Sequence, residues 1–192
     1  VDIGGTNTEL GVVDSESGIV EVISFKTKNA NSFDNYIQCL IDNIQSLLNK
    51  YEIFSIGIGA PNFDSQNNVF RPVNFPWNDL RPFNLKSFIE KELHINTNVV
   101  NDANAAALAE NRFGIGKEYD SFIMVTIGTG LGGAIIINNK LFDGAFGYSG
   151  EFGHTKIDQL SRKCNCGSVG CLETIVSANG IKKTYSLNLK NI

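Results

Sequence analysis

The stretch VDIGGTNTELGVVD, residues 1–14, decides the fold, because it predicts a strand, a glycine turn and a second strand. The first strand covers Val1–Ile3, the turn covers Gly4–Asn7, and the second strand covers Thr8–Asp14. After a further turn, Ile19–Thr27 predicts a third strand. Strands joined by short glycine-containing turns are typical of β-hairpins, so the chain is expected to begin with them.

The first glycine turn is suited to binding an anion. Gly4 and Gly5 let backbone N–H groups approach a phosphate closely, and Asp2 can hold Mg²⁺ directly or through water. An ordinary tight turn beside an exposed aspartate explains the same residues, and this motif alone does not separate the two interpretations.

The same plan recurs further along the chain. Ser121–Ile127 predicts a strand, a glycine-rich turn follows, and the run AIIIN predicts another strand. Three glycines of this turn match the dinucleotide fingerprint G-x-G-x-x-G: Gly128, Gly130 and Gly133. That fingerprint has to open a helix, whereas here a β-branched run follows, so a Rossmann site is excluded. Two phosphate-binding hairpins facing each other across a cleft are expected instead.

Helices and strands alternate between the two hairpins. Ser32 is a suitable N-cap for a helix to about Lys50, since apolar residues recur there at helical spacing. Ile53–Gly59 predicts a buried strand, and Asn84 is expected to cap a short helix. The stretch 62–82, rich in proline and asparagine, is expected to be a long functional loop rather than a linker.

Asp102 lies at a junction where ligand groups are common. Thr97–Val100 predicts a strand that runs into Asn101-Asp102, and the alanine-rich segment behind it predicts a helix. The carboxyl end of a strand is where ligands bind in open α/β sheets. Taken alone, a plain N-cap aspartate is the simpler interpretation, but the surrounding motifs favour a functional one.

Cysteine and histidine gather in the stretch 151–173, EFGHTKIDQLSRKCNCGSVGCLE. Three thiolates and an imidazole are a complete ligand set for tetrahedral Zn²⁺, and four protein ligands are typical of a structural site. The ligands would be His154, Cys164, Cys166 and Cys171. Three cysteines cannot all pair with one another and the segment is too polar for a core, so zinc is favoured over buried or disulfide-bonded cysteines.

Composition limits the remaining choices. With 192 residues and 42% hydrophobic content, the chain can form one large domain or two small ones, and a net charge of −4 gives no indication of nucleic-acid binding. No apolar run of about 18 residues predicts a membrane span, and no signal peptide is visible. Free cysteines at metal spacing indicate a reducing compartment, hence the cytoplasm. Because the chain opens at Val1 without an initiating Met, a fragment is expected.

Taken together, these motifs resemble the ROK family of sugar kinases and sugar-responsive repressors, within the actin-like ATPase superfamily. Asp2–Asn7 matches the first phosphate motif, Asn101–Ala106 the catalytic segment and Gly128–Gly133 the second phosphate motif. Glu151–His154 and the pattern C-x-C-G-x-x-G-C-x-E over Cys164–Glu173 complete the set. The last pattern is highly specific, and the five motifs span the whole chain.

The resemblance implies an α/β protein with the two-domain, ribonuclease H-like fold of actin-like ATPases. Residues 1–115 would be the N-terminal domain, and 116–192 would begin a second, incomplete domain. The implied activity is ATP-dependent phosphorylation of a hexose, with glucose at its 6-OH the first choice, in the presence of Mg²⁺. The family also implies a homodimer.

The resemblance assigns roles residue by residue. Asp102 would be the general base, and the sugar would be bound by Asn101, Glu151, His154 and Glu173. The ATP phosphates would be held by Asp2, Gly4, Gly5, Thr6 and Asn7, and by Gly128, Thr129, Gly130 and Gly132. His154 would place one ring nitrogen on zinc and the other on the sugar, so that zinc positions the loop rather than acting as a Lewis acid.

Two departures from the family pattern stand out. Ala134 replaces a glycine that many members carry, and its methyl group is expected to tighten the second turn. The family's chain also continues beyond Ile192 and supplies most of the adenine side of the nucleotide pocket there. The alternative function is a sugar-sensing repressor, which carries a helix-turn-helix before the first phosphate motif; retention of Asp2, Asp102 and both glycine hairpins favours the kinase.

Overall fold

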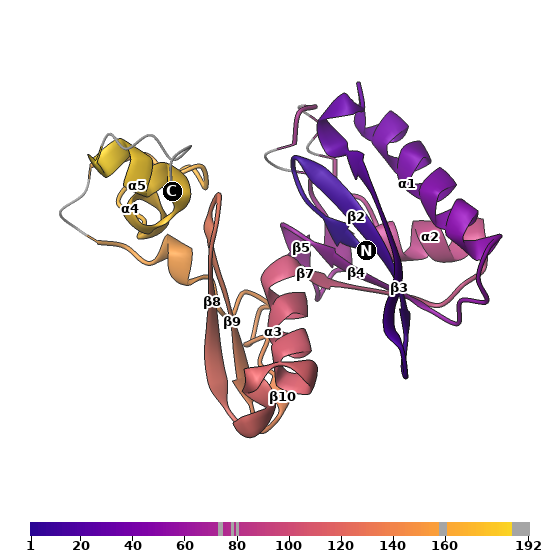
Figure 1. Cartoon of the computed structure of the whole chain (residues 1–192). Helices are drawn as coiled ribbons and strands as arrows, with labels where there is room; N and C mark the ends of the chain where they lie inside the picture. Colours follow the sequence, from indigo (N-terminus) through magenta and orange to yellow (C-terminus); the bar gives the residue numbers. More distant parts are fainter. Residues whose placement is uncertain (73–74, 78, 80, 158–160, 186–192) are drawn as a thin grey trace. The chain divides into compact units, whose positions relative to one another are not determined.

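The computed structural model describes residues 1–72, 75–77, 79, 81–157 and 161–185. The chain divides into two compact units, Val1–Ala105 and Ala106–Ile192 (Figure 1). The division falls inside a helix, and the domain boundary predicted between residues 115 and 116 stays a prediction.

A five-stranded sheet with the order β3-β2-β1-β4-β7 forms the first unit. β1, β2 and β3 pair antiparallel, as the hairpin pattern predicted, whereas β1, β4 and β7 pair parallel. The turn between β1 and β2 is Gly4–Thr6, and we call it the first glycine turn. The strands are β1 (Asp2–Ile3), β2 (Asn7–Asp14), β3 (Gly18–Lys26), β4 (Ile56–Ala60) and β7 (Thr97–Asn101).

Two capped helices, α1 (Phe33–Leu48) and α2 (Leu85–Leu93), complete this unit. The Ser32 hydroxyl accepts a hydrogen bond from the Asn35 N–H and the Asn84 side chain accepts one from the Ser87 N–H, so both predicted caps are confirmed. The apolar stripe of α1 packs into one core with the sheet. The 3₁₀ segment η1 (Thr27–Asn29) follows β3.

The stretch 62–82 is anchored by aromatic side chains. It contains β5 (Phe63–Asp64) and β6 (Val69–Phe70), which form a two-stranded sheet. Trp77 is 7% exposed and its ring lies 5.0 Å from that of Tyr36 on α1. Residues 73, 74, 78 and 80 lie outside the described residues, and the functional role of this loop stays a prediction.

The second unit contains a three-stranded antiparallel sheet, β10-β9-β8. Its second glycine turn, Gly128–Gly130, joins β8 (Phe122–Ile127) to β9 (Leu131–Ile137), so a strand and not a helix follows the glycines. Asn138 and Asn139 both have positive φ, of 50° and 60°, as the tight hairpin turn to β10 (Lys140–Leu141) requires.

Helix α3 (Asp102–Phe113) packs against this sheet through Ala107, which shares a small core with Ala134 and Ile136. The expectation that Ala134 tightens the second turn is wrong. Ala134 pairs with Met124 inside the β-ladder and is fully buried, so its methyl group fills core space.

Short elements complete the second unit: η2 (Ile115–Glu118), η3 (Phe152–His154), α4 (Glu173–Val176) and α5 (Ala178–Tyr185). The Ser177 hydroxyl accepts a hydrogen bond from the Gly180 N–H and so caps α5. Throughout the residues that the structure describes, no helix has both the length and the apolar character that a membrane crossing demands.

Candidate functional site

The first unit gathers its predicted site residues at one edge of its sheet. Gly59 of β4 pairs with Asp2, and Ala60 pairs with Asn101 of β7. Because β1, β4 and β7 are parallel, their carboxyl ends share this edge, which therefore carries the first glycine turn and Asp102. Ligand groups are expected at such an edge.

The first glycine turn is held by a buried chain of hydroxyl groups. Thr27 Oγ1 donates to the Gly4 carbonyl at 2.7 Å and lies 2.9 Å from Thr8 Oγ1, which in turn lies 3.0 Å from the Tyr36 hydroxyl. All three side chains are fully buried. Nothing in the sequence pattern predicted this support, because the three residues come from β2, η1 and α1 and meet only in the fold.

Gly4 itself is required by a close approach. Its N–H donates to the Asn7 carbonyl at 3.0 Å, and a Cβ at Gly4 would lie 2.7 Å from the same oxygen. A larger residue would open the turn and change the direction of its backbone N–H groups.

Asn101, rather than Asp102, provides the cap of α3. Asn101 Oδ1 accepts from the N–H groups of Ala103, at 2.9 Å, and Asn104, at 3.3 Å. Asp102 Oδ1 also accepts from the Ala103 N–H at 2.9 Å, while the residue stays exposed. Although the residue keeps access to solvent, the protein atoms around its carboxyl group partly desolvate it, and this raises the pKa of Asp102; the Ala103 N–H opposes this shift and the charge of Asp2 adds to it.

In the second unit, both ends of the second glycine turn are bonded to the C-terminal helices. The Leu131 N–H donates to Glu173 Oε2 at 2.9 Å, and the Ala178 N–H donates to the Gly128 carbonyl at 2.9 Å. Within the turn, the Gly128 N–H donates to the Gly130 carbonyl at 3.0 Å. The turn is therefore fixed by residues that follow it by more than forty positions.

Segment 150–153 packs directly on β9. A Cβ at Gly153 would lie 2.2 Å from the Leu131 carbonyl oxygen, and a Cβ at Gly150 would lie 2.4 Å from the Gly133 carbonyl oxygen. Gly150 also has a φ of +87°, which favours glycine. These glycines bring Glu151 and His154 next to the strand that follows the second glycine turn, a role that the sequence analysis did not assign to them.

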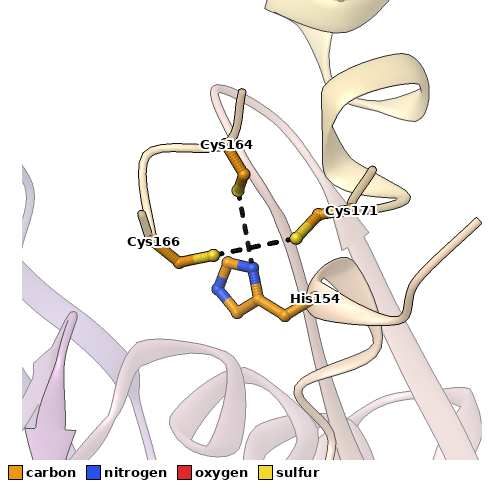
Figure 2. Close-up of side chains that lie close together, drawn as sticks. All are labelled: His154, Cys164, Cys166 and Cys171. Carbon is orange, nitrogen blue, oxygen red and sulfur yellow. Dashed lines mark hydrogen bonds between the residues drawn. The ribbon is translucent and has the colours of Figure 1, made fainter. Parts of the chain in front are cut away.

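The four predicted metal ligands converge, as Figure 2 shows. The ligand atoms of His154, Cys164, Cys166 and Cys171, which we call the Cys/His cluster, all lie within 4.8 Å of one another. Cys166 Sγ is 3.7 Å from Cys171 Sγ, and Cys164 Sγ is 3.8 Å from His154 Nδ1. Zn–S bonds of about 2.3 Å in a tetrahedron place two sulfurs about 3.8 Å apart, so the donor set and its spacing fit zinc.

All four cysteines of the chain are free thiols in this structure, which matches a metal site better than a disulfide. Burial raises the pKa of the Cys164 thiol to about 12. A metal ion would displace this proton, since thiolates are the ligands that zinc takes.

The two ring nitrogens of His154 face different groups. Nδ1 faces the sulfur atoms (Figure 2). Nε2 lies 3.7 Å from Glu151 Oε2. This orientation suits the predicted double role, with one nitrogen for a metal and the other for a ligand. The sugar-binding roles of Asn101, Glu151, His154 and Glu173 stay predictions.

Comparisons with known proteins agree on one family. The sequence model that describes the ROK family matches residues 1–192 of this chain. The chain is 37% identical over 183 residues to a glucokinase of Streptomyces coelicolor, covering 94% of the chain and 56% of that protein. It is 34% identical over 189 residues to a xylose repressor of Bacillus subtilis, covering 95% of the chain and 48% of the repressor.

Among solved structures, the chain resembles a ROK family glucokinase from Streptomyces griseus in complex with glucose and AMPPNP. The TM-score is 0.80 at 37% identity, covering 95% of this chain and 57% of that one. The predicted α/β fold of actin-like ATPases is therefore confirmed. The chain spans about half the length of the relatives it matches, so their remaining part lies outside the comparison.

Proposed function

The chain belongs to the ROK family, as its motifs predicted, and we propose that the protein containing it phosphorylates a hexose with ATP. The observation that carries this proposal is the position of Asp102: an exposed carboxylate at the sheet edge that also bears the first glycine turn. Similarity to glucokinases, at 37% identity, makes glucose the first substrate to test and its 6-OH the acceptor.

In the proposed reaction, Asp102 accepts the proton of the sugar hydroxyl as its oxygen attacks the γ-phosphorus of ATP. A new P–O bond forms, the bond between the γ-phosphorus and the β,γ-bridging oxygen breaks, and ADP leaves with that electron pair. Such transfer depends on positioning and on neutralising charge. Backbone N–H groups of both glycine turns would hold phosphates, and Asp2 would hold Mg²⁺, which supplies charge neutralisation when bound.

Zinc in the Cys/His cluster is part of the proposal. The ion would be structural, because the four protein ligands leave no open position for a substrate. Its ligand loop would present Glu151, His154 and Glu173 to the sugar, and the family resemblance also gives Asn101 a sugar-binding role. A homodimer is proposed only from the family.

A sugar-sensing repressor is the second candidate, and the 34% identity to a xylose repressor favours it. A sensor has to bind the sugar and change shape, but it needs neither a general base nor a phosphate site. Asp102 and the two glycine turns have no role in that function, which is why the kinase is preferred.

The test measures ADP formation by the full-length protein with glucose and Mg²⁺, for the wild type and for Asp102→Asn. A general base contributes about 10²–10⁴-fold, so turnover is expected to fall by that factor while glucose binding, measured by calorimetry, persists. Equal turnover by the two proteins would show that Asp102 is not the base. A wild type that binds sugar and operator DNA but forms no ADP would favour the repressor.

A further inference from the structure

We propose that Glu173 is a positioning residue for the second glycine turn, and that it links the geometry of this turn to the Cys/His cluster. The state of the cluster would then control how well the protein binds the phosphates of ATP, and not only the sugar. The identity of the anion rests on the proposed function, whereas the link between Glu173 and the turn does not.

The two oxygens of the Glu173 carboxylate contact different features: one the second glycine turn, the other the Cys/His cluster. Oε2 accepts the hydrogen bond of the Leu131 N–H at 2.9 Å, at the first residue after the turn. Oε1 lies 3.7 Å from Cys164 Sγ, which belongs to the cluster. One half-buried side chain therefore touches both features.

Gly130 shows how closely the carboxylate approaches. A Cβ at Gly130 would lie 2.6 Å from Glu173 Oε2, so the carboxylate occupies the space where a side chain would stand. A negative charge beside a phosphate-binding turn repels its ligand. The carboxylate therefore has to contribute a stabilising effect larger than this repulsion. Holding the turn in one orientation, through the hydrogen bond to the Leu131 N–H, is such an effect.

Glu173 is also close to the Cys/His cluster along the chain. Cys171 is two residues from Glu173, and the Leu172 N–H between them donates to the Thr155 carbonyl at 2.9 Å. Arg162 Nη1 donates to the Thr174 carbonyl at 2.9 Å and to Thr184 Oγ1 at 2.8 Å, which ties the cysteine loop to α4 and α5. A metal that fixes Cys164 and Cys171 therefore fixes the backbone that aims Glu173.

The competing interpretation is that Glu173 serves only as a sugar ligand. In that case its removal would weaken glucose binding and raise the KM for glucose, and binding of nucleotide in the absence of sugar would be unchanged. If Glu173 positions the turn, nucleotide binding weakens without any sugar present.

The experiment measures the affinity of the full-length protein for AMPPNP with Mg²⁺ and without sugar. Glu173→Ala is expected to bind AMPPNP about 10-fold to 100-fold more weakly, the usual effect of losing a supporting group. Glu173→Gln keeps an oxygen that accepts from the Leu131 N–H, so it is expected to restore most of the affinity. Glu118→Ala is the matched control, since it removes an exposed carboxylate of the second unit to which no binding role is assigned; its affinity for AMPPNP should equal that of the wild type.

A second measurement needs neither nucleotide nor activity. Amide hydrogen exchange at Leu131 is expected to speed up in Glu173→Ala and in wild-type protein stripped of zinc by a chelator, and to return to its slow rate when zinc is restored. This readout stays informative if the protein proves not to be a kinase. Unchanged exchange at Leu131 in both samples, or unchanged AMPPNP affinity in a zinc-loaded Glu173→Ala variant, would overturn the proposal.

Discussion

Substitution of Gly153 by alanine tests how tightly segment 150–153 is seated on β9. The new Cβ would lie 2.2 Å from the Leu131 carbonyl oxygen, whereas Cβ contacts shorter than 3.0 Å are essentially never seen. The contact has to open by about 0.8 Å, from 2.2 to 3.0 Å, and the atom opposite is backbone, which cannot rotate away. His154 is the next residue and has to move with it.

The expected cost has two parts. Overpacking of this kind destabilises by about 1–3 kcal/mol. Metal–ligand distances are held within about 0.2 Å, so a displacement several times larger disturbs the imidazole ligand and is expected to lower zinc affinity by about 10-fold to 100-fold.

The assay is competition for zinc between the protein and a chromophoric chelator, together with urea unfolding followed in the second unit. Gly128→Ala is the matched control, because a Cβ at Gly128 meets no atom within 4 Å and the residue lies in the turn of the β8–β9 hairpin on which Gly153 packs. Zinc affinity within twofold of the wild type in Gly153→Ala would refute the reasoning, since it would mean that His154 is not held by this contact.

Three further outcomes are expected. Cys171→Ser should release zinc and weaken glucose binding, measured by metal analysis and calorimetry; full zinc content would contradict the structural metal site. If Asp102 is the base, as proposed, it acts in its ionised form, and its raised pKa means that kcat/KM should begin to fall at a higher pH than an ordinary aspartate would give as the pH is lowered. Asp2→Asn should move the NMR titration of Asp102 to lower pH, and an unmoved titration would remove Asp2 as a cause. Thr27→Val removes the hydrogen bonds of Thr27 to the Gly4 carbonyl and to Thr8, so the free energy of unfolding of the first unit should fall by about 1–3 kcal/mol. Thr27→Ser should restore most of this stability. A loss below about 0.5 kcal/mol in Thr27→Val would show that the hydroxyl chain does not hold the turn.

Local chemistry explains why much of the fold was predictable. Ser32 and Asn84 cap helices because their side chains reach N–H groups three residues on, which is a property of the sequence itself. The G-x-G-x-x-G pattern could be separated from a Rossmann fingerprint because β-branched residues follow it. The Cys/His cluster was predictable because three cysteines and one histidine at close spacing form a complete zinc ligand set, whereas disulfide pairing would leave one of the three cysteines over.

Contacts between distant segments were not predictable in this way. Thr8, Thr27 and Tyr36 are unremarkable residues until the fold buries their hydroxyl groups against one another. Glu173 was assigned to the sugar from a resemblance, and only the structure reveals its bond to the Leu131 N–H. Gly153 lies within the motif Glu151–His154, but the close approach of Gly150 and Gly153 to β9 depends on packing that no local spacing encodes.

The central claim, that the protein is a hexose kinase, is tested most directly by following ADP formation by the full-length, zinc-loaded protein with ATP and Mg²⁺. Hexoses and N-acetylhexosamines are added one at a time. The account predicts ADP formation that depends on one of these sugars, glucose first, and that disappears in Asp102→Asn. No sugar-dependent ADP from a folded, zinc-loaded protein would contradict it.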